Sequence, residues 1–186
     1  MRIALPLLLA ACTHPAPPAF PTGDVHDFDE FAGAWKFANK RLDKRGVGSH
    51  TFDEFPAYSC TTTYLGGIAN VDEVTFPTKG WGGLTVRTFD IAKHRWSIYW
   101  VNTRTGVMFP PVVGGFTGAI GEFYGDDDDD GKPVKVRFRW TKHDRDHLTW
   151  EQSFSYDGGT TWEMNWTNDL ERDAPSGCVN GRPAPR

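Results

Sequence analysis

The amino-acid sequence predicts an all-β protein, and three observations support this fold class. Apolar and polar side chains alternate with a period of two, most regularly at residues 148–154 and 162–167, which is the pattern of a half-buried strand. The chain contains 20 glycines and 13 prolines but no long helical period, which favours many short strands joined by turns. Aromatic residues make up 14% of the chain, and strands favour aromatic side chains.

Turn-forming clusters divide the chain into successive strands and predict its topology. A short helical turn is expected at residues 27–31. Strands are expected after it at 34–42, 58–65, 68–76, 84–89, 95–102, 116–124, 134–141, 148–154 and 162–167. Because the links resemble hairpins, this meander closes most simply into an up-and-down antiparallel β-barrel of about 8–10 strands.

The link at residues 155–162, Ser-Tyr-Asp-Gly-Gly-Thr-Thr-Trp, is the clearest turn in the sequence. Its glycines accept positive φ angles, and the side chain of Asp157 can hydrogen-bond the backbone two residues further on. The segment also resembles the Asp-box of sialidase-like propellers. A propeller repeats its blades every ~40–50 residues, whereas this motif occurs once. We therefore interpret it as a hairpin turn and reject the propeller.

Length and charge restrict the class of protein further. A chain of 186 residues is expected to form one main domain. We place the barrel at residues 27–172, after a signal segment (1–11) and a proline-rich tether (12–26) and before a polar tail (173–186). The net charge is −4 and no basic face is evident, so nucleic acid is not an expected partner.

The N-terminus has the pattern of a targeting segment. The first two residues carry one positive charge, and the apolar run at 3–11 is far shorter than the ~20 residues of a spanning helix. The run ends in Leu9-Ala10-Ala11-Cys12, which resembles a bacterial lipoprotein lipobox. The resemblance implies cleavage before Cys12, a diacylglycerol on its thiol and a membrane anchor, with Thr13 favouring the outer membrane and a periplasm-facing domain. An ordinary secretory signal is the alternative.

Two further cysteines, Cys60 and Cys178, form the candidate disulfide of the exported domain. An exported chain enters an oxidising compartment, where paired cysteines are usually oxidised. Such a bridge would attach the tail to the barrel wall. The alternative is a reactive thiol pair, which lacks the Cys-x-x-Cys spacing of redox motifs.

Several short motifs together resemble one family. They are Trp35 in the first strand, the run with Arg87, Asp90 and Trp96, and the segments at 121–123, 137–140 and 157–163. Over residues 29–172 the chain is similar to bacterial lipocalin-like (calycin-type) barrels of unknown function. The resemblance implies the barrel fold and leaves function open, because the motifs consist mostly of turn and packing residues. Barrels of lipocalin size have room for one small ligand.

Two clusters carry residue types that bind metals. Asp126, Asp128 and Asp130 precede Gly131 and match the opening of a calcium loop, but Arg137 stands where an EF-hand has its glutamate. The alternative is a solvated acidic turn. His143 and His147 flank a charged triplet, and across a hairpin they would lie close enough to share a metal; the alternative is a hydrated turn. No other cofactor is expected.

Four residues on predicted strands are candidates for the barrel interior: Tyr99, Arg137, Glu151 and Trp166. An inward arginine, glutamate and tyrosine would polarise a carboxylate-bearing ligand, as in some barrel decarboxylases. The alternative is an outward ion pair, because the apolar face of the arginine's strand is formed by Val136, Phe138 and Trp140. We find no nucleophile elbow and no spacing typical of a catalytic triad, so no catalytic residue is predicted. A binding protein is therefore the preferred hypothesis over an enzyme.

The apolar loop around Val107, Met108 and Phe109 is the last candidate, because Pro110 and Pro111 exclude an ordinary central strand. It is either a lid over a ligand, a contact patch for a partner, or a cover that closes the core. The main functional hypothesis is an envelope lipoprotein that binds a small apolar or amphipathic molecule. The alternatives are a barrel enzyme using the interior candidates and a packed interaction module without a ligand.

Overall fold

The computed structural model describes residues 20–185. The predicted signal segment at 1–11, Cys12 and most of the predicted tether lie outside these residues, and the assignments made for them stay predictions. Among residues 20–185, no helix is long and apolar enough to span a membrane.

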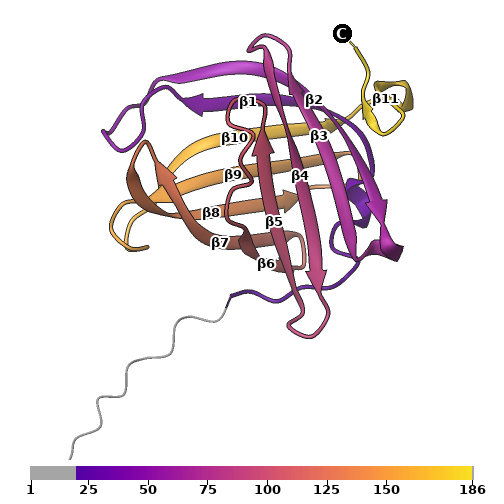
Figure 1. The fold of residues 1–186 in the computed structure, drawn as a ribbon, viewed down its shortest axis with the longest axis horizontal. Helices are drawn as coiled ribbons and strands as arrows, with labels where there is room; N and C mark the ends of the chain where they lie inside the picture. Colours follow the sequence, from indigo (N-terminus) through magenta and orange to yellow (C-terminus); the bar gives the residue numbers. More distant parts are fainter. Residues whose placement is uncertain (1–19, 186) are drawn as a thin grey trace, which may run out of the picture.

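Within the described residues, ten strands form one closed antiparallel barrel (Figure 1). Each strand pairs with the next along the chain, and β10 pairs with β1 to close the barrel. The strands are β1 (Gly33–Leu42), β2 (Phe52–Tyr64), β3 (Ala69–Phe76), β4 (Trp81–Asp90), β5 (Arg95–Asn102), β6 (Val112–Thr117), β7 (Ile120–Asp129), β8 (Lys132–Lys142), β9 (His147–Ser155) and β10 (Glu163–Arg172). This confirms the predicted all-β, up-and-down architecture.

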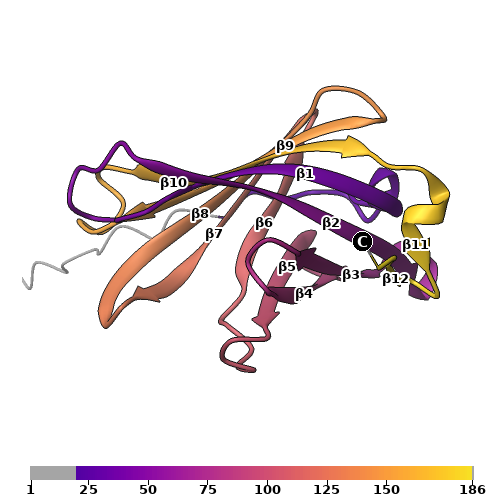
Figure 2. The same cartoon turned by 90° about the horizontal axis from the view of Figure 1, so that it is seen from above.

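Short elements complete the fold. The turn predicted near residue 29 is a 3₁₀ helix, η1 (Asp29–Phe31), and two more such turns follow, η2 (Leu65–Gly67) and η3 (Pro175–Gly177). A small ribbon in the tail, β11 (Cys178–Val179) and β12 (Arg182–Pro183), lies beside β2 and β3. Strands β3–β5 cross β8–β10 at a steep angle, so the barrel resembles two packed sheets (Figures 1 and 2).

One strand predicted from the sequence is two strands in the structure. The single strand expected at 116–124 is β6 followed by β7, joined by a two-residue turn in which Thr117 pairs with Ile120. Gly118 at the turn has φ +62, a left-handed conformation that glycine adopts without strain. The expected acidic loop is also shorter, because β7 continues along the aspartates and turns only at Asp130 and Gly131, both with positive φ.

One end of the barrel is closed by the segment before β1. The rings of Phe28 and Phe31 insert between the strands and contact Trp96, Phe116 and Trp140 edge to face. Indole N–H groups fix this segment: Trp35 Nε1 donates to the carbonyl of residue 31, and Trp96 Nε1 donates to the carbonyl of residue 24, each at 2.8 Å. Apolar burial and these bonds hold the segment in place. We call the segment with Phe28 and Phe31 the stopper, and the end of the barrel that it closes the η1 end.

The tail is attached to the outer barrel wall. Cys60 in β2 and Cys178 in β11 form a disulfide with their Cα atoms 5.6 Å apart, which confirms the predicted pair. Arg182 adds two hydrogen bonds to Glu73 in β3, of 2.7 and 2.8 Å. The tail predicted to be polar therefore packs against β2 and β3.

The turn at 155–162 is organised by Asp157. Its carboxylate accepts hydrogen bonds from the Ser155 hydroxyl at 2.7 Å, from the Thr161 hydroxyl at 2.7 Å and from the backbone of both threonines. The bonds from Thr161 and Ser155 lower the pKa of Asp157 to about 2. These bonds fix the hairpin between β9 and β10, in agreement with the predicted structural turn.

Candidate ligand-binding site

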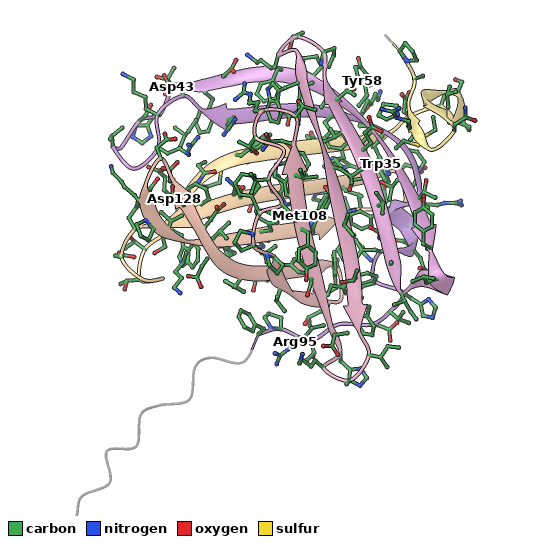
Figure 3. All side chains as sticks on the ribbon, in the orientation of Figure 1. Trp35, Asp43, Tyr58, Arg95, Met108 and Asp128 are labelled. Carbon is green, nitrogen blue, oxygen red and sulfur yellow. A yellow bond between two sulfur atoms is a disulfide. The ribbon has the colours of Figure 1, made fainter. Side chains whose placement is uncertain are left out.

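The barrel encloses a cavity of about 110 Å³ between the η1 end and the opposite end. Its position follows from strand alternation, since every second side chain of a barrel strand points inward. Aromatic residues are the largest group in the wall, whose lining residues are Phe31, Trp35, Phe37, Ser59, Thr61, Asp72, Val74, Phe76, Thr85, Arg87, Ile98, Trp100, Phe138, Trp140, Trp150, Gln152, Trp166, Asn168 and Leu170. Trp35, labelled in Figure 3, lies where β1 meets the stopper.

The volume limits what the cavity can hold. Engineered apolar cavities of ~150 Å³ bind benzene, whereas pockets for drug-sized ligands measure ~300–1,000 Å³. A cavity of about 110 Å³ matches a short chain or, with small shifts of the wall, a single ring. A long lipid tail does not fit.

An ion pair is buried in the cavity wall. Arg87 Nη1 in β4 lies 2.6 Å from Asp72 Oδ1 in β3, and both side chains are almost fully buried. The same nitrogen donates to Asn70 Oδ1 at 2.9 Å, and the Thr85 hydroxyl donates to Asp72 Oδ2 at 3.2 Å. The Arg87 guanidinium carbon also lies 5.1 Å from the Phe28 ring centre. The pair is neutral as a unit and is fixed from several sides.

Apart from Asp72 Oδ1, which forms the ion pair with Arg87, three polar atoms of the lining residues have no hydrogen-bond partner within the described chain. They are Arg87 Nε and Trp140 Nε1, which are donors, and Asn168 Oδ1, an acceptor. Arg87 is 4% exposed and Trp140 is 6% exposed, so bulk water does not reach them freely. A buried polar group without a partner costs about 1–3 kcal/mol. The wall is therefore suited to a guest that accepts two hydrogen bonds and donates one.

At the end opposite the stopper, Trp166 in β10 forms part of the wall. Its indole N–H donates to Asn39 Oδ1 at 3.0 Å, which fixes the ring orientation. The Arg41 guanidinium carbon lies 4.7 Å from the centre of the same ring. The Trp166 indole thus borders both the cavity and a charged side chain near the surface.

The residues expected in the interior are only partly there. Trp166 lines the cavity, whereas Tyr99, Arg137 and Glu151 do not. The reason is parity: each of the three alternates along its strand with residues that do line the cavity, namely Ile98 and Trp100, Phe138, and Trp150 and Gln152. The expected interior group of arginine, glutamate and tyrosine is therefore not assembled in the cavity.

Arg137 instead takes part in an outer-face cluster. Its guanidinium carbon lies 5.0 Å from the Trp162 ring, and Nη2 lies 3.4 Å from the Ser153 hydroxyl. Trp162 also contacts Tyr124, whose hydroxyl donates to Glu122 at 3.2 Å. This cluster holds the turn at 155–162 against the outside of β7 and β8.

The apolar loop between β5 and β6 follows the last residues of β5. The Phe109 N–H donates to the Trp100 carbonyl at 2.8 Å, while the Val107 and Met108 side chains are 60% and 49% exposed. Figure 3 labels Met108 on this loop. None of Val107, Met108 and Phe109 lines the cavity, so the loop covers the wall near Trp100 from outside.

The acidic run is tied to neighbouring residues. Asp126 pairs with Lys135 on β8, Asp128 accepts the Gly131 N–H at 2.6 Å, and Asp130 is almost fully exposed. Asp129, which the calcium pattern leaves out, is buried and paired with Arg45. Among residues 20–185, no three His, Cys, Asp or Glu side chains gather as they would around a metal ion.

The two histidines of the β8–β9 hairpin lie side by side, as their spacing suggested. The His143 and His147 rings stack with centres 4.6 Å apart. His147 Nε2 lies 2.7 Å from Asp169 Oδ1, and His143 Nε2 lies 3.1 Å from the Thr149 hydroxyl. Each ring thus has a local partner, as in the alternative of a hydrated turn.

Sequence reasoning did not place Arg87 in the barrel interior and did not single out Asp72. The available signal was Arg87 within the family-like motif and, on the preceding strand, polar residues at alternate positions, Asn70 and Asp72. In the structure Asn70 is the register partner of Arg87. The register between β3 and β4 was needed to recognise that Asp72 and Arg87 form a buried ion pair.

Neither a protein-family model nor a curated protein matches this chain. We therefore argue its function from the cavity and its lining residues.

Proposed function

We propose that this protein is an envelope lipoprotein with a lipocalin-like barrel that binds one small apolar or amphipathic molecule in its interior cavity. The observation that carries the proposal is an aromatic cavity whose wall contains Arg87 and Trp140, both buried and each with an unpartnered N–H. A barrel that served only as a packed module would gain stability from apolar residues at these positions.

The cavity wall specifies the guest in outline. Aromatic faces suit a ring or a short hydrocarbon chain, and the volume of about 110 Å³ excludes larger groups. The free N–H groups of Arg87 and Trp140 suit an acceptor such as a carbonyl or ether oxygen. Asn168 Oδ1 suits a hydroxyl or amide donor. The ligand is thus a compact molecule with one apolar body and a few polar atoms.

Filling the cavity should abolish binding. Val74 is buried in the wall, and Val74→Phe places a ring in the space of the guest. We expect native mass spectrometry of the full chain, extracted in mild detergent, to show a small-molecule adduct that Val74→Phe reduces at least about tenfold, at a folding cost of about 1–3 kcal/mol.

Val71→Phe is the matched control, because Val71 lies on the same strand but outside the cavity lining. It should keep the adduct. An adduct of equal intensity in both variants, or none in the parent chain, would contradict the cavity as the binding site.

The anchor is tested by the mass of the same sample after denaturation. We expect a chain that begins at Cys12 and carries the mass of its acyl chains, because two or more chains are needed for stable anchoring. Cys12→Ser should lose that added mass and accumulate with residues 1–11 attached. An unacylated chain cleaved at another residue would support an ordinary secretory signal.

A further inference from the structure

We propose that the ligand is an organic monoanion, whose apolar part occupies the cavity and whose carboxylate binds Arg41 and Arg104 at the end opposite the stopper. We call these two side chains the arginine rim. This inference rests on the proposed function and adds the charge and orientation of the ligand.

The rim is formed by two guanidinium groups stacked on neighbouring indoles. Arg41 at the end of β1 stacks on Trp166, and Arg104, just after β5, stacks on Trp81 with its guanidinium carbon 4.5 Å from the ring centre. The two indole rings are 6.3 Å apart. These are cation–π contacts with the indole rings, and a guanidinium group in such a contact can still donate N–H groups to an anion.

The arginine rim differs from the other cations nearby in having no carboxylate partner. Arg45 is bound to Asp129, and Lys79 is bound to Asp53. Among residues 20–185, Arg41 and Arg104 form no ion pair with any carboxylate. A half-buried arginine without a counter-ion is unfavourable, and an anionic ligand would supply one.

Electrostatics at Arg41 agree with this arrangement. Burial, and then the positive charges of Arg45 and Arg104, lower the pKa of the Arg41 guanidinium to about 10. The side chain remains charged at neutral pH, and the more distant carboxylates of Asp129 and Asp53 offset only part of these effects. An anion at this position would relieve both the desolvation and the repulsion.

The rim and the cavity share one wall residue, Trp166. Trp166 belongs to both, since one face supports Arg41 and the ring forms part of the cavity wall. The partly exposed side chains of Trp100 and Phe37 also line this end. A ring or short chain in the cavity with a carboxylate one or two bonds away matches these positions, whereas a free inorganic anion would leave the aromatic wall unused.

The test compares two probes of equal shape, phenylacetate and phenylacetamide, which differ in charge. The full chain in detergent micelles is titrated with each, the indole N–H signals of Trp140 and Trp166 are followed by NMR, and partition into empty micelles is subtracted. We expect phenylacetate to bind about tenfold more tightly than the amide, because a charge-assisted bond is stronger than a neutral one. Arg41→Gln should remove this preference by weakening phenylacetate binding far more than phenylacetamide binding.

Two further variants separate the rim from general charge effects. Arg104→Gln, at an exposed position, should reduce the preference several-fold. Arg145→Gln removes an equal charge from the exposed β8–β9 turn and should change neither affinity. Equal affinity for both probes, or an unchanged preference in Arg41→Gln, would overturn the anion site while the cavity stands. If neither probe shifts Trp140, the proposed cavity function fails and this inference fails with it.

Discussion

Asp72→Ala should lower the free energy of unfolding by about 3–5 kcal/mol, the largest effect we expect from one substitution in this barrel. The substitution leaves the Arg87 guanidinium buried without the carboxylate that lies 2.6 Å from it. The Thr85 hydroxyl loses its acceptor at the same time. Bulk water has little access to the charge, because Arg87 is 4% exposed and lies beside the aromatic rings of the stopper and of Trp140. Urea unfolding followed by tryptophan fluorescence measures the change.

The double variant Asp72→Leu with Arg87→Met provides the control for this prediction. It removes both charges together, so no unpaired ion remains, and we expect it to recover most of the lost stability. The double variant should still lose ligand binding, because it removes the Arg87 N–H from the wall. A loss below about 1 kcal/mol in Asp72→Ala would show that the pair is solvated and would contradict the buried site.

Removing the disulfide should have the second largest effect. Cys60→Ala combined with Cys178→Ala should cost about 2–5 kcal/mol, because the bridge restricts the unfolded chain over a sequence separation of 118 residues. The bonds of Arg182 to Glu73, which lie at the surface, and the bond from the Asp173 N–H to the Ala34 carbonyl then still attach the tail. Unfolding of the parent chain with and without a reducing agent should reproduce the difference.

The disulfide and the cavity lie on opposite sides of β2. The cavity lies on the inner side of β2, lined there by Ser59 and Thr61, whereas Cys60 bonds the tail on the outer side. Ligand affinity should therefore change little when the bridge is removed. A loss of ligand binding equal to that in Val74→Phe would show that the tail contributes to the site.

The fold class followed from the sequence because strand periodicity and turn residues are local signals. Alternation in β9 and β10 and the Asp157 turn were sufficient to locate that hairpin, and the structure agrees. The boundary between β6 and β7 was missed because Gly118 and Ala119 interrupt an otherwise continuous apolar pattern by a minimal turn. A two-residue turn offers few residues from which to recognise it.

The site was less predictable, because it depends on which face of each strand is inward. Arg137 and Arg87 have the same chemistry and similar apolar neighbours, yet one is on the outer face and the other is buried in the cavity wall. Parity is set by closure of the whole barrel and by register between distant strands, such as β1 with β10. The bulge between Met164 and Trp166 shifts the register in β10 and turns Trp166 into the cavity.

A crystal structure of the full chain, purified without denaturation from the cells that produce it, tests the central claim most directly. We predict electron density for one compact molecule in the cavity, surrounded by Trp35, Trp150 and Trp166. The molecule should accept a hydrogen bond from Trp140 Nε1. Its carboxylate should lie beside Arg41. A cavity closed by its own side chains, or a ligand bound only outside the barrel, would contradict the account.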